Sequence, residues 1–243
     1  MTGGTPRILI TGFRPFPGAP YNPTANLVER LLHLRRPALE NIDRIGHVFP
    51  VTYSAVDREL PALIAKHHPD ALLMFGLATR TPFIRIETRA RNTITQIWPD
   101  ADHTRVLSRT IVKNTESTRR FGPHTLRLLR AAQGTGVDAR ASLNAGYYLC
   151  NYLSWRAIEA THAPDGPLLA AFVHVPLVSR STEQRRKGAA QRMTFEQLVD
   201  AGEAMLMAVA ARINLRNFNS AKSAPSSFSP VIDPSPLYQN TVL

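Results

Sequence analysis

A chain of 243 residues with 44% hydrophobic side chains can bury one large core, which excludes a wholly disordered protein, and no apolar run is long enough for a transmembrane helix. Its single cysteine excludes an internal disulfide and a cysteine-rich metal site, and the absence of an apolar signal core near the start predicts a cytoplasmic protein. The net charge of +11 suits a polyanionic partner, but the arginines are scattered and no nucleic-acid-binding motif accompanies them, so nucleic-acid binding is kept only as an alternative.

Short apolar runs alternate with amphipathic segments as far as about residue 216. Strands separated by helices of about 10 to 15 residues predict a three-layer α/β/α sandwich with a mixed, mainly parallel central sheet. This single domain, 1–216, precedes a tail, 217–243, whose serines and prolines predict little regular structure. In chain order we expect a strand at 7–11, a helix opening at 22–24, a strand at 48–51, a helix at 54–68, strands at 71–75 and 83–91, helices at 119–132 and 150–160, a strand at 168–175 and a helix at 194–213.

Cys150 stands at the expected start of a helix, after a turn of small residues. The positive end of a helix dipole lowers the pKa of a thiol and favours the nucleophilic thiolate. Burial as an inert structural side chain is the common fate of a lone cysteine, so the position alone leaves both interpretations open.

His174 closes the buried strand at 168–175, where a polar ring is costly unless it is hydrogen-bonded. A cysteine nucleophile needs a base that works near neutrality, usually a histidine, and a third group that orients the ring. Glu87, in an otherwise apolar and basic strand, is a candidate for that third group. Its alternative is an ion pair with one of the arginines at 85, 89 and 91, and His174 is alternatively a satisfied core histidine.

The loop after the first strand carries two aromatic side chains, Phe13 and Phe16, that line an apolar pocket or simply pack in the core. The loop lacks the glycine spacing of a phosphate or dinucleotide site, so no cofactor is expected. The chain has no HExxH motif and no clustered acidic ligand set, so no catalytic metal is expected either.

Four segments together resemble the pyroglutamyl peptidase I family, which forms the C15 class of cysteine peptidases. The cysteine segment fits the family signature at every specified position, and the resemblance runs from about residue 7 to 213. The segments are Thr11-Gly12-Phe13-x-Pro15-Phe16 with Asn22-Pro23-Thr24, Gly76…Ile84-x-x-Glu87-x-x-Ala90-x-Asn92, Ser142-x-x-Ala145-Gly146-x-Tyr148-Leu149-Cys150-Asn151, and Phe172-Val173-His174-Val175-Pro176.

The resemblance implies a Cys150–His174–Glu87 triad that hydrolyses the amide bond after an amino-terminal pyroglutamyl residue through a thioester. It also implies pyroglutamyl peptides as partners and a homo-oligomer, a dimer or tetramer. The residues expected to bind substrate are Phe13, Phe16, Leu77, Trp98, Tyr148 and Leu149.

The departures from the family pattern lie in the segments that we expect to be near the substrate. Thr79 and Arg80 replace two glycines, Ile97 stands where the family keeps an arginine beside the site, and Thr88 follows Glu87 in place of a base. Three functions therefore stay open: a pyroglutamyl peptidase with compensating contacts, a relative that acts on another amide or lactam-like acyl group, and an inert ligand-binding scaffold.

Overall fold

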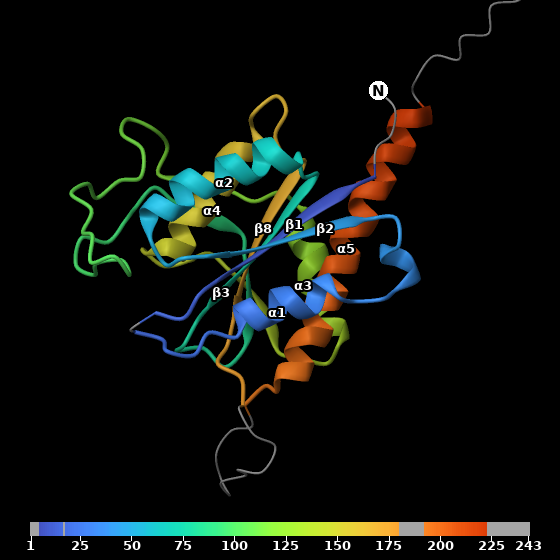
Figure 1. The fold of residues 1–243 in the computed structure, drawn as a ribbon, viewed down its shortest axis with the longest axis horizontal. Helices are drawn as coiled ribbons and strands as arrows, with labels where there is room; N and C mark the ends of the chain where they lie inside the picture. Colours follow the sequence, from blue (N-terminus) through green and yellow to red (C-terminus); the bar gives the residue numbers. More distant parts are fainter. Residues whose placement is uncertain (1–4, 17, 180–191, 223–243) are drawn as a thin grey trace, which may run out of the picture.

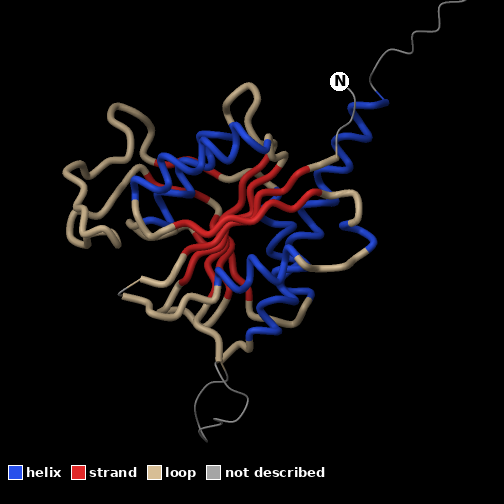
Figure 2. The backbone as a smooth tube through the Cα atoms, in the orientation of Figure 1, coloured by secondary structure: helices blue, strands red, loops and turns tan. Residues whose placement is uncertain are grey.

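The computed structural model describes residues 5–16, 18–179 and 192–222, with side chains described as far as residue 215. A six-stranded sheet runs through the middle of this part of the chain, between two layers of helices (Figures 1 and 2). The predicted three-layer α/β sandwich is therefore confirmed. The expected tail beyond residue 222 lies outside the described residues.

The central sheet has the strand order β2-β1-β3-β8-β4-β7. β1, β2, β3 and β8 run parallel to one another, whereas β4 is antiparallel to β8 and parallel to β7. A separate two-stranded sheet pairs β5 with β6. The strands are β1 (Arg7–Phe13), β2 (Asp43–Phe49), β3 (Ala71–Leu77), β4 (Ile84–Glu87), β5 (Arg89–Arg91), β6 (Thr118–Arg120), β7 (Ala139–Ser142) and β8 (Leu169–Val175).

Each face of the sheet packs against its own group of helices. One hydrophobic cluster joins the sheet to α1, α3 and α5, and a second cluster joins the other face to α2 and α4 (Figure 1). The helices are α1 (Thr24–Leu32), the short 3-10 helix η1 (Pro37–Leu39), α2 (Tyr53–His67), α3 (His124–Gly134), α4 (Leu149–Thr161) and α5 (Phe195–Lys222). Among the described residues, no helix combines the length and the apolar character needed to cross a membrane.

Several expected boundaries were wrong, for local reasons. The strand expected at 48–51 spans Asp43–Phe49, because this edge strand is largely polar and half-exposed and so lacks a long apolar run. The segment 83–91 is two strands in different sheets, divided at Thr88, whose N–H and hydroxyl both donate to the Ser142 carbonyl of β7. β7 itself was not predicted.

Two helices also differ from their expected limits. The helix expected at 119–132 begins only at His124, because Thr118–Arg120 pairs as a strand and Pro123 occupies the N-cap. α5 continues to Lys222, past the residue at which we expected the domain to end.

Parallel pairing brings the ends of three central strands to one edge of the sheet. β1 ends at Phe13, β3 at Leu77 and β8 at Val175. At this edge α1 approaches closely: a Cβ on Gly12 would lie 2.8 Å from the Thr24 carbonyl oxygen, while the Thr24 hydroxyl donates to the Phe13 carbonyl. The first segment of the resemblance therefore forms the end of β1 and the start of α1, which pack closely and are joined by this hydrogen bond.

Candidate active site

Cys150 is the second residue of α4, next to the carboxyl edge of the sheet. Gly146 turns the chain with a φ of 86°, and extended backbone at Tyr148 then caps the helix. Buried Asn151 fixes this helix start to β5, since its side chain accepts the Arg91 N–H and donates to the Arg91 carbonyl. The signature residues around Cys150 therefore set the position of the thiol.

A glycine makes room for the thiol. A Cβ on Gly76 would lie 2.8 Å from Cys150 Sγ and 2.6 Å from Phe172 Cζ, so the sulfur packs almost directly on the backbone of β3. In the sheet register Gly76 is paired with His174 on the neighbouring strand β8. The expected nucleophile therefore packs on the strand position that pairs with the expected base.

His174 and Glu87 are in direct contact. His174 Nδ1 lies 2.7 Å from Glu87 Oε1, and the exposed fractions of the two side chains are 4% and 0%. An ionised carboxylate only accepts hydrogen bonds, so the shorter contact, to Glu87, favours the tautomer with the proton on Nδ1 and an unprotonated Nε2. His174 in this tautomer is arranged to accept a proton at Nε2.

Arg85 joins the same pair. Its Nη2 lies 3.2 Å from Glu87 Oε1 and 3.0 Å from His174 Nδ1. The sequence offered Glu87 either as the partner of a histidine or as the partner of an arginine, and the structure has it as both. The missed signal was the spacing: residues 85 and 87 share one face of a strand, so both side chains point toward the same neighbour.

Burial determines the direction of the pKa shift at both Cys150 and His174. Burial, reinforced by the negative charge of Glu87, raises the pKa of the Cys150 thiol to about 12. Arg85 and the Cys150 N–H at the helix start lower that pKa, but burial outweighs them, so the expected net lowering by the helix terminus was wrong. Burial also lowers the pKa of His174. Both shifts favour the uncharged thiol and imidazole over a thiolate–imidazolium pair.

Several aromatic side chains belong to the same hydrophobic cluster as the thiol. Phe16 and Tyr148 lie with ring centroids 6.4 Å apart, and Tyr148 donates from its hydroxyl to the Pro99 carbonyl. Phe13 is buried in the same cluster, against Phe49 at 6.0 Å. Sequence reasoning missed Tyr53, whose ring is 5.9 Å from that of Tyr148 and whose buried hydroxyl has no hydrogen-bond partner among the described residues.

The other expected substrate residues are more scattered. Leu149 is fully buried in the core cluster of the α2–α4 face, and Leu77 is half-buried next to Gly76. Trp98 is 60% exposed on the long segment between β5 and β6, which projects as green loops in Figure 1. Their contribution to substrate binding stays a prediction.

The altered family positions lie in two loops. Thr79 and Arg80 are exposed in the turn after β3, and neither has a positive φ, so this turn does not require glycine for its backbone. Ile97 has a side chain that is 74% exposed on the long loop.

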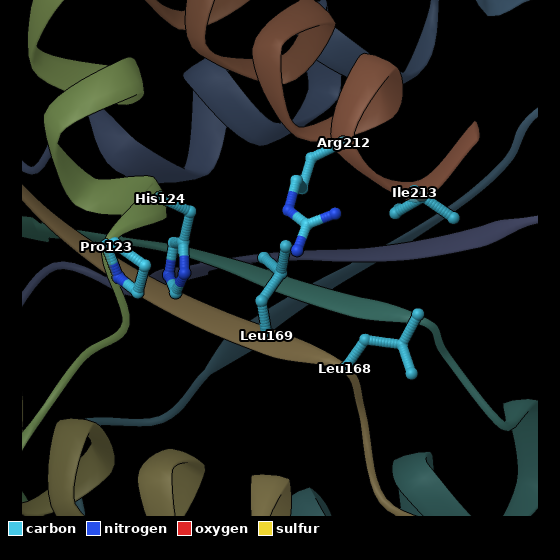
Figure 3. A pocket seen from close by; sticks show the side chains of 6 residues that line it. All are labelled: Pro123, His124, Leu168, Leu169, Arg212 and Ile213. Atoms are coloured by element: carbon cyan, nitrogen blue, oxygen red, sulfur yellow. The ribbon is translucent and has the colours of Figure 1, made fainter. Parts of the chain in front are cut away.

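A separate pocket lies at the opposite end of β8 from His174. It has a volume of about 140 Å³, and Figure 3 shows the Arg212 side chain reaching from α5 toward Leu169 at the start of β8. None of the expected site residues lines this pocket. Within the described ranges, no group of three or more His, Cys, Asp or Glu side chains is placed to hold a metal ion.

We expect Gly76→Ala to lower kcat/KM by about 100-fold, because the new methyl group would lie only 2.8 Å from Cys150 Sγ and displace the thiol. The variant should fold, since the groups in its way are the ends of two side chains. The matched control is Gly134→Ala, whose Cβ would meet no atom within 4 Å. Unchanged kinetics in Gly76→Ala would show that the thiol does not need this position.

Comparison with known proteins agrees with this geometry. Residues 6–213 match the family model described as pyroglutamyl peptidase. The pyrrolidone-carboxylate peptidase of Thermococcus kodakarensis is 29% identical over 81% of this chain and 99% of its own length. That of Vibrio vulnificus is 30% identical over 83% of this chain and 91% of its own.

Solved structures of similar fold carry the same name. The pyrrolidone carboxyl peptidase from Thermococcus litoralis superposes with a TM-score of 0.77 at 25% identity, covering 87% of this chain and 96% of that one. A mutant pyrrolidone carboxyl peptidase from Pyrococcus furiosus superposes with a TM-score of 0.74 at 25% identity, covering 85% of this chain and 98% of that one.

Proposed function

The chain belongs to the pyroglutamyl peptidase family, and we propose that Cys150, His174 and Glu87 hydrolyse the amide bond after an amino-terminal pyroglutamyl residue. The observation that carries this proposal is the 2.7 Å contact between His174 Nδ1 and Glu87 Oε1, beside a thiol packed against Gly76. The contact holds the imidazole in place, and with the thiol packed on Gly76, which pairs with His174, it supports the nucleophile and base that covalent acyl transfer needs.

In the proposed reaction, Cys150 Sγ bonds to the pyroglutamyl carbonyl carbon while the thiol proton moves to His174 Nε2. The tetrahedral intermediate then breaks its C–N bond, and His174 returns the proton to the leaving amine. Water attacks the thioester, His174 takes a proton from that water, and free pyroglutamate leaves as the thiol is restored. The first-turn N–H groups of α4 have no helical carbonyl to bind, which supports a role for them in stabilising the oxyanion.

The lowered pKa of His174 suits the second half of this cycle. A weak base gives up its proton readily, so an imidazolium formed in the buried site protonates the leaving amine efficiently. The same property is unfavourable in the first half, because the thiol must lose its proton to that weak base. Both halves thus depend on how the carboxylate of Glu87 stabilises the imidazolium.

The surroundings favour a neutral acyl group over a charged amino terminus. Two acidic side chains are buried in the described part of the chain, and both are already engaged. Glu87 binds His174 and Arg85, while Asp100 accepts the backbone N–H groups of Tyr53, Asp102 and Thr104. An ammonium group at this site would have to compete with His174 and Arg85 for Glu87, whereas an uncharged lactam ring needs no carboxylate.

The test is the rate of release of aminomethylcoumarin from two matched substrates. We expect the protein to cleave pyroglutamyl-aminomethylcoumarin at least about 100-fold faster than prolyl-aminomethylcoumarin, which has the same ring size but a charged amine. Equal rates, or faster cleavage of the prolyl compound, would favour another acyl group. No cleavage of any acyl substrate together with an inert thiol would favour the ligand-binding scaffold.

Two further expectations stay predictions. A homo-oligomer is supported by the exposed apolar side chains of Ile97, Trp98 and Leu107, which all belong to the long loop between β5 and β6. A cytoplasmic location rests on the sequence alone.

A further inference from the structure

We propose that Arg85 is a positioning residue of this site: its guanidinium, fixed opposite His174 by the pairing of β4 with β8, binds the Glu87 carboxylate and so holds it against the imidazole. The proposal rests on the proposed function for its catalytic meaning, although its geometry is independent of any substrate. Neither the resemblance nor the spacing of the triad assigns a role to this residue.

The first step concerns the charge of Glu87. Its side chain is fully buried, and of its two oxygens only Oε1 has partners among the described residues, namely His174 and Arg85. A buried carboxylate is strongly disfavoured unless a cation or several hydrogen bonds compensate it. Because His174 is neutral at rest, the compensating cation is Arg85.

The second step concerns how Arg85 comes to lie there. β4 is antiparallel to β8, and Arg85 is the residue directly opposite His174 in that pairing. Glu87 stands two residues further on the same face of β4. The sheet register therefore fixes the cation, the carboxylate and the imidazole together, and with a side chain 22% exposed Arg85 is the one of the three that reaches partly toward solvent.

The third step concerns hydrogen bonds at one oxygen. A guanidinium only donates, and His174 Nδ1–H also donates, so the two share Glu87 Oε1 at 3.2 Å and 2.7 Å. Arg85 thereby draws electron density from the acceptor that stabilises the imidazolium, and it places a positive charge 3.0 Å from Nδ1. Both effects make His174 a weaker base and a better donor to the leaving amine.

The sign of the effect follows from charge. A nearby cation lowers the pKa of every group whose acid form is more positive than its base form, so Arg85 lowers the pKa of His174 and of Cys150 alike. Removing the charge of Arg85 must therefore raise the pKa of both groups. Among the described residues, the titratable and charged groups that interact with the Cys150–His174 pair are Arg85 and Glu87 on β4, Tyr53 on α2 and Tyr148 at the start of α4.

The experiment compares Arg85→Gln, which removes the charge, with Arg85→Lys, which keeps it. The first readout is the rate of alkylation of Cys150 by iodoacetamide as a function of pH, which needs no substrate and is unambiguous because Cys150 is the only cysteine of the chain. At a pH well below the thiol pKa, a rise of about one unit slows alkylation about tenfold. We expect that slowing in Arg85→Gln and near-wild-type rates in Arg85→Lys.

The second readout is the pH profile of kcat/KM on pyroglutamyl-aminomethylcoumarin. We expect the acid limb to move upward by about one pH unit in Arg85→Gln, because the imidazolium loses its proton at higher pH, and to stay in place in Arg85→Lys. The matched control is Arg89→Gln, which removes the same charge from β5, where the Arg89 guanidinium donates to the Leu143 carbonyl instead.

Two results would overturn the proposal. Equal alkylation profiles for the glutamine and lysine variants would show that the charge of Arg85 has no part in the chemistry. An equal loss of activity in both variants, with a lower Tm and no shift of either profile, would assign Arg85 a packing role only. If the wild-type protein cleaves no pyroglutamyl substrate while the alkylation shift is present, the proposed function fails and the role of Arg85 stands.

Discussion

Replacing Cys150 with serine is expected to reduce kcat/KM on pyroglutamyl-aminomethylcoumarin by at least about 10⁴-fold. Burial already raises the thiol pKa to about 12, and it also lowers the pKa of the base. A hydroxyl in the same place is a still weaker acid than the thiol. Transfer of its proton to His174 would therefore be more unfavourable, because burial also makes His174 a weak base. The purified variant is assayed beside the wild type under conditions of excess enzyme.

The substitution changes one atom, so folding should be intact and the Tm should stay close to that of the wild type. Cys150→Ala serves as a second variant with no nucleophile at all, and both variants should be inert to iodoacetamide because the chain has no other cysteine. A serine variant that kept a tenth of the wild-type activity would show that some other group attacks the substrate.

The position of the reacting groups was predictable from the sequence. A buried run ending in a histidine and a cysteine at a helix start both belong to the carboxyl edge of a parallel sheet, where active sites of this architecture lie. β8 ends one residue after His174, and α4 begins one residue before Cys150. Short-range patterns suffice for such placements because hydrophobic periodicity determines where strands and helices end.

The link between Glu87 and its two partners was not predictable in the same way. Local spacing placed arginines near Glu87 but did not choose between an arginine and a histidine as its partner. The choice depends on the antiparallel register of β4 against β8, which pairs residues almost ninety positions apart in the chain. No local pattern encodes such a register, since it follows from how the whole sheet packs.

The protonation state of Cys150 was predicted with the wrong sign. The helix start does lower the thiol pKa through the N–H of Cys150, as expected. The dominant cause is burial of the thiol, and it acts in the opposite direction. Burial depends on tertiary packing. The sequence therefore indicated the smaller effect on the thiol pKa, that of the helix start, but not the larger effect of burial.

Glu87→Gln is expected to separate the two functions of the carboxylate, lowering kcat/KM by about 10³-fold while making the thiol easier to alkylate. The amide no longer stabilises the imidazolium, because the hydrogen bond and the charge of Glu87 are what raise the pKa of His174 against burial. The same charge raises the pKa of Cys150, so its removal lowers that pKa and increases the thiolate fraction at a fixed pH. Catalysis and thiol reactivity should therefore change in opposite directions.

Both quantities are measured on the same preparations, as kcat/KM and as the iodoacetamide rate at one pH. Glu159→Gln is the matched control, since it removes a negative charge from α4 that pairs with Arg119 and Arg156, neither of which interacts with the thiol. A parallel loss of both rates in Glu87→Gln would mean that the variant disturbs the packing around Cys150. Unchanged catalysis would mean that Glu87 serves only to pair Arg85. A lower kcat/KM together with a faster iodoacetamide reaction would identify Glu87 as the group that stabilises the imidazolium. The same charge would then also be what disfavours the thiolate before the reaction.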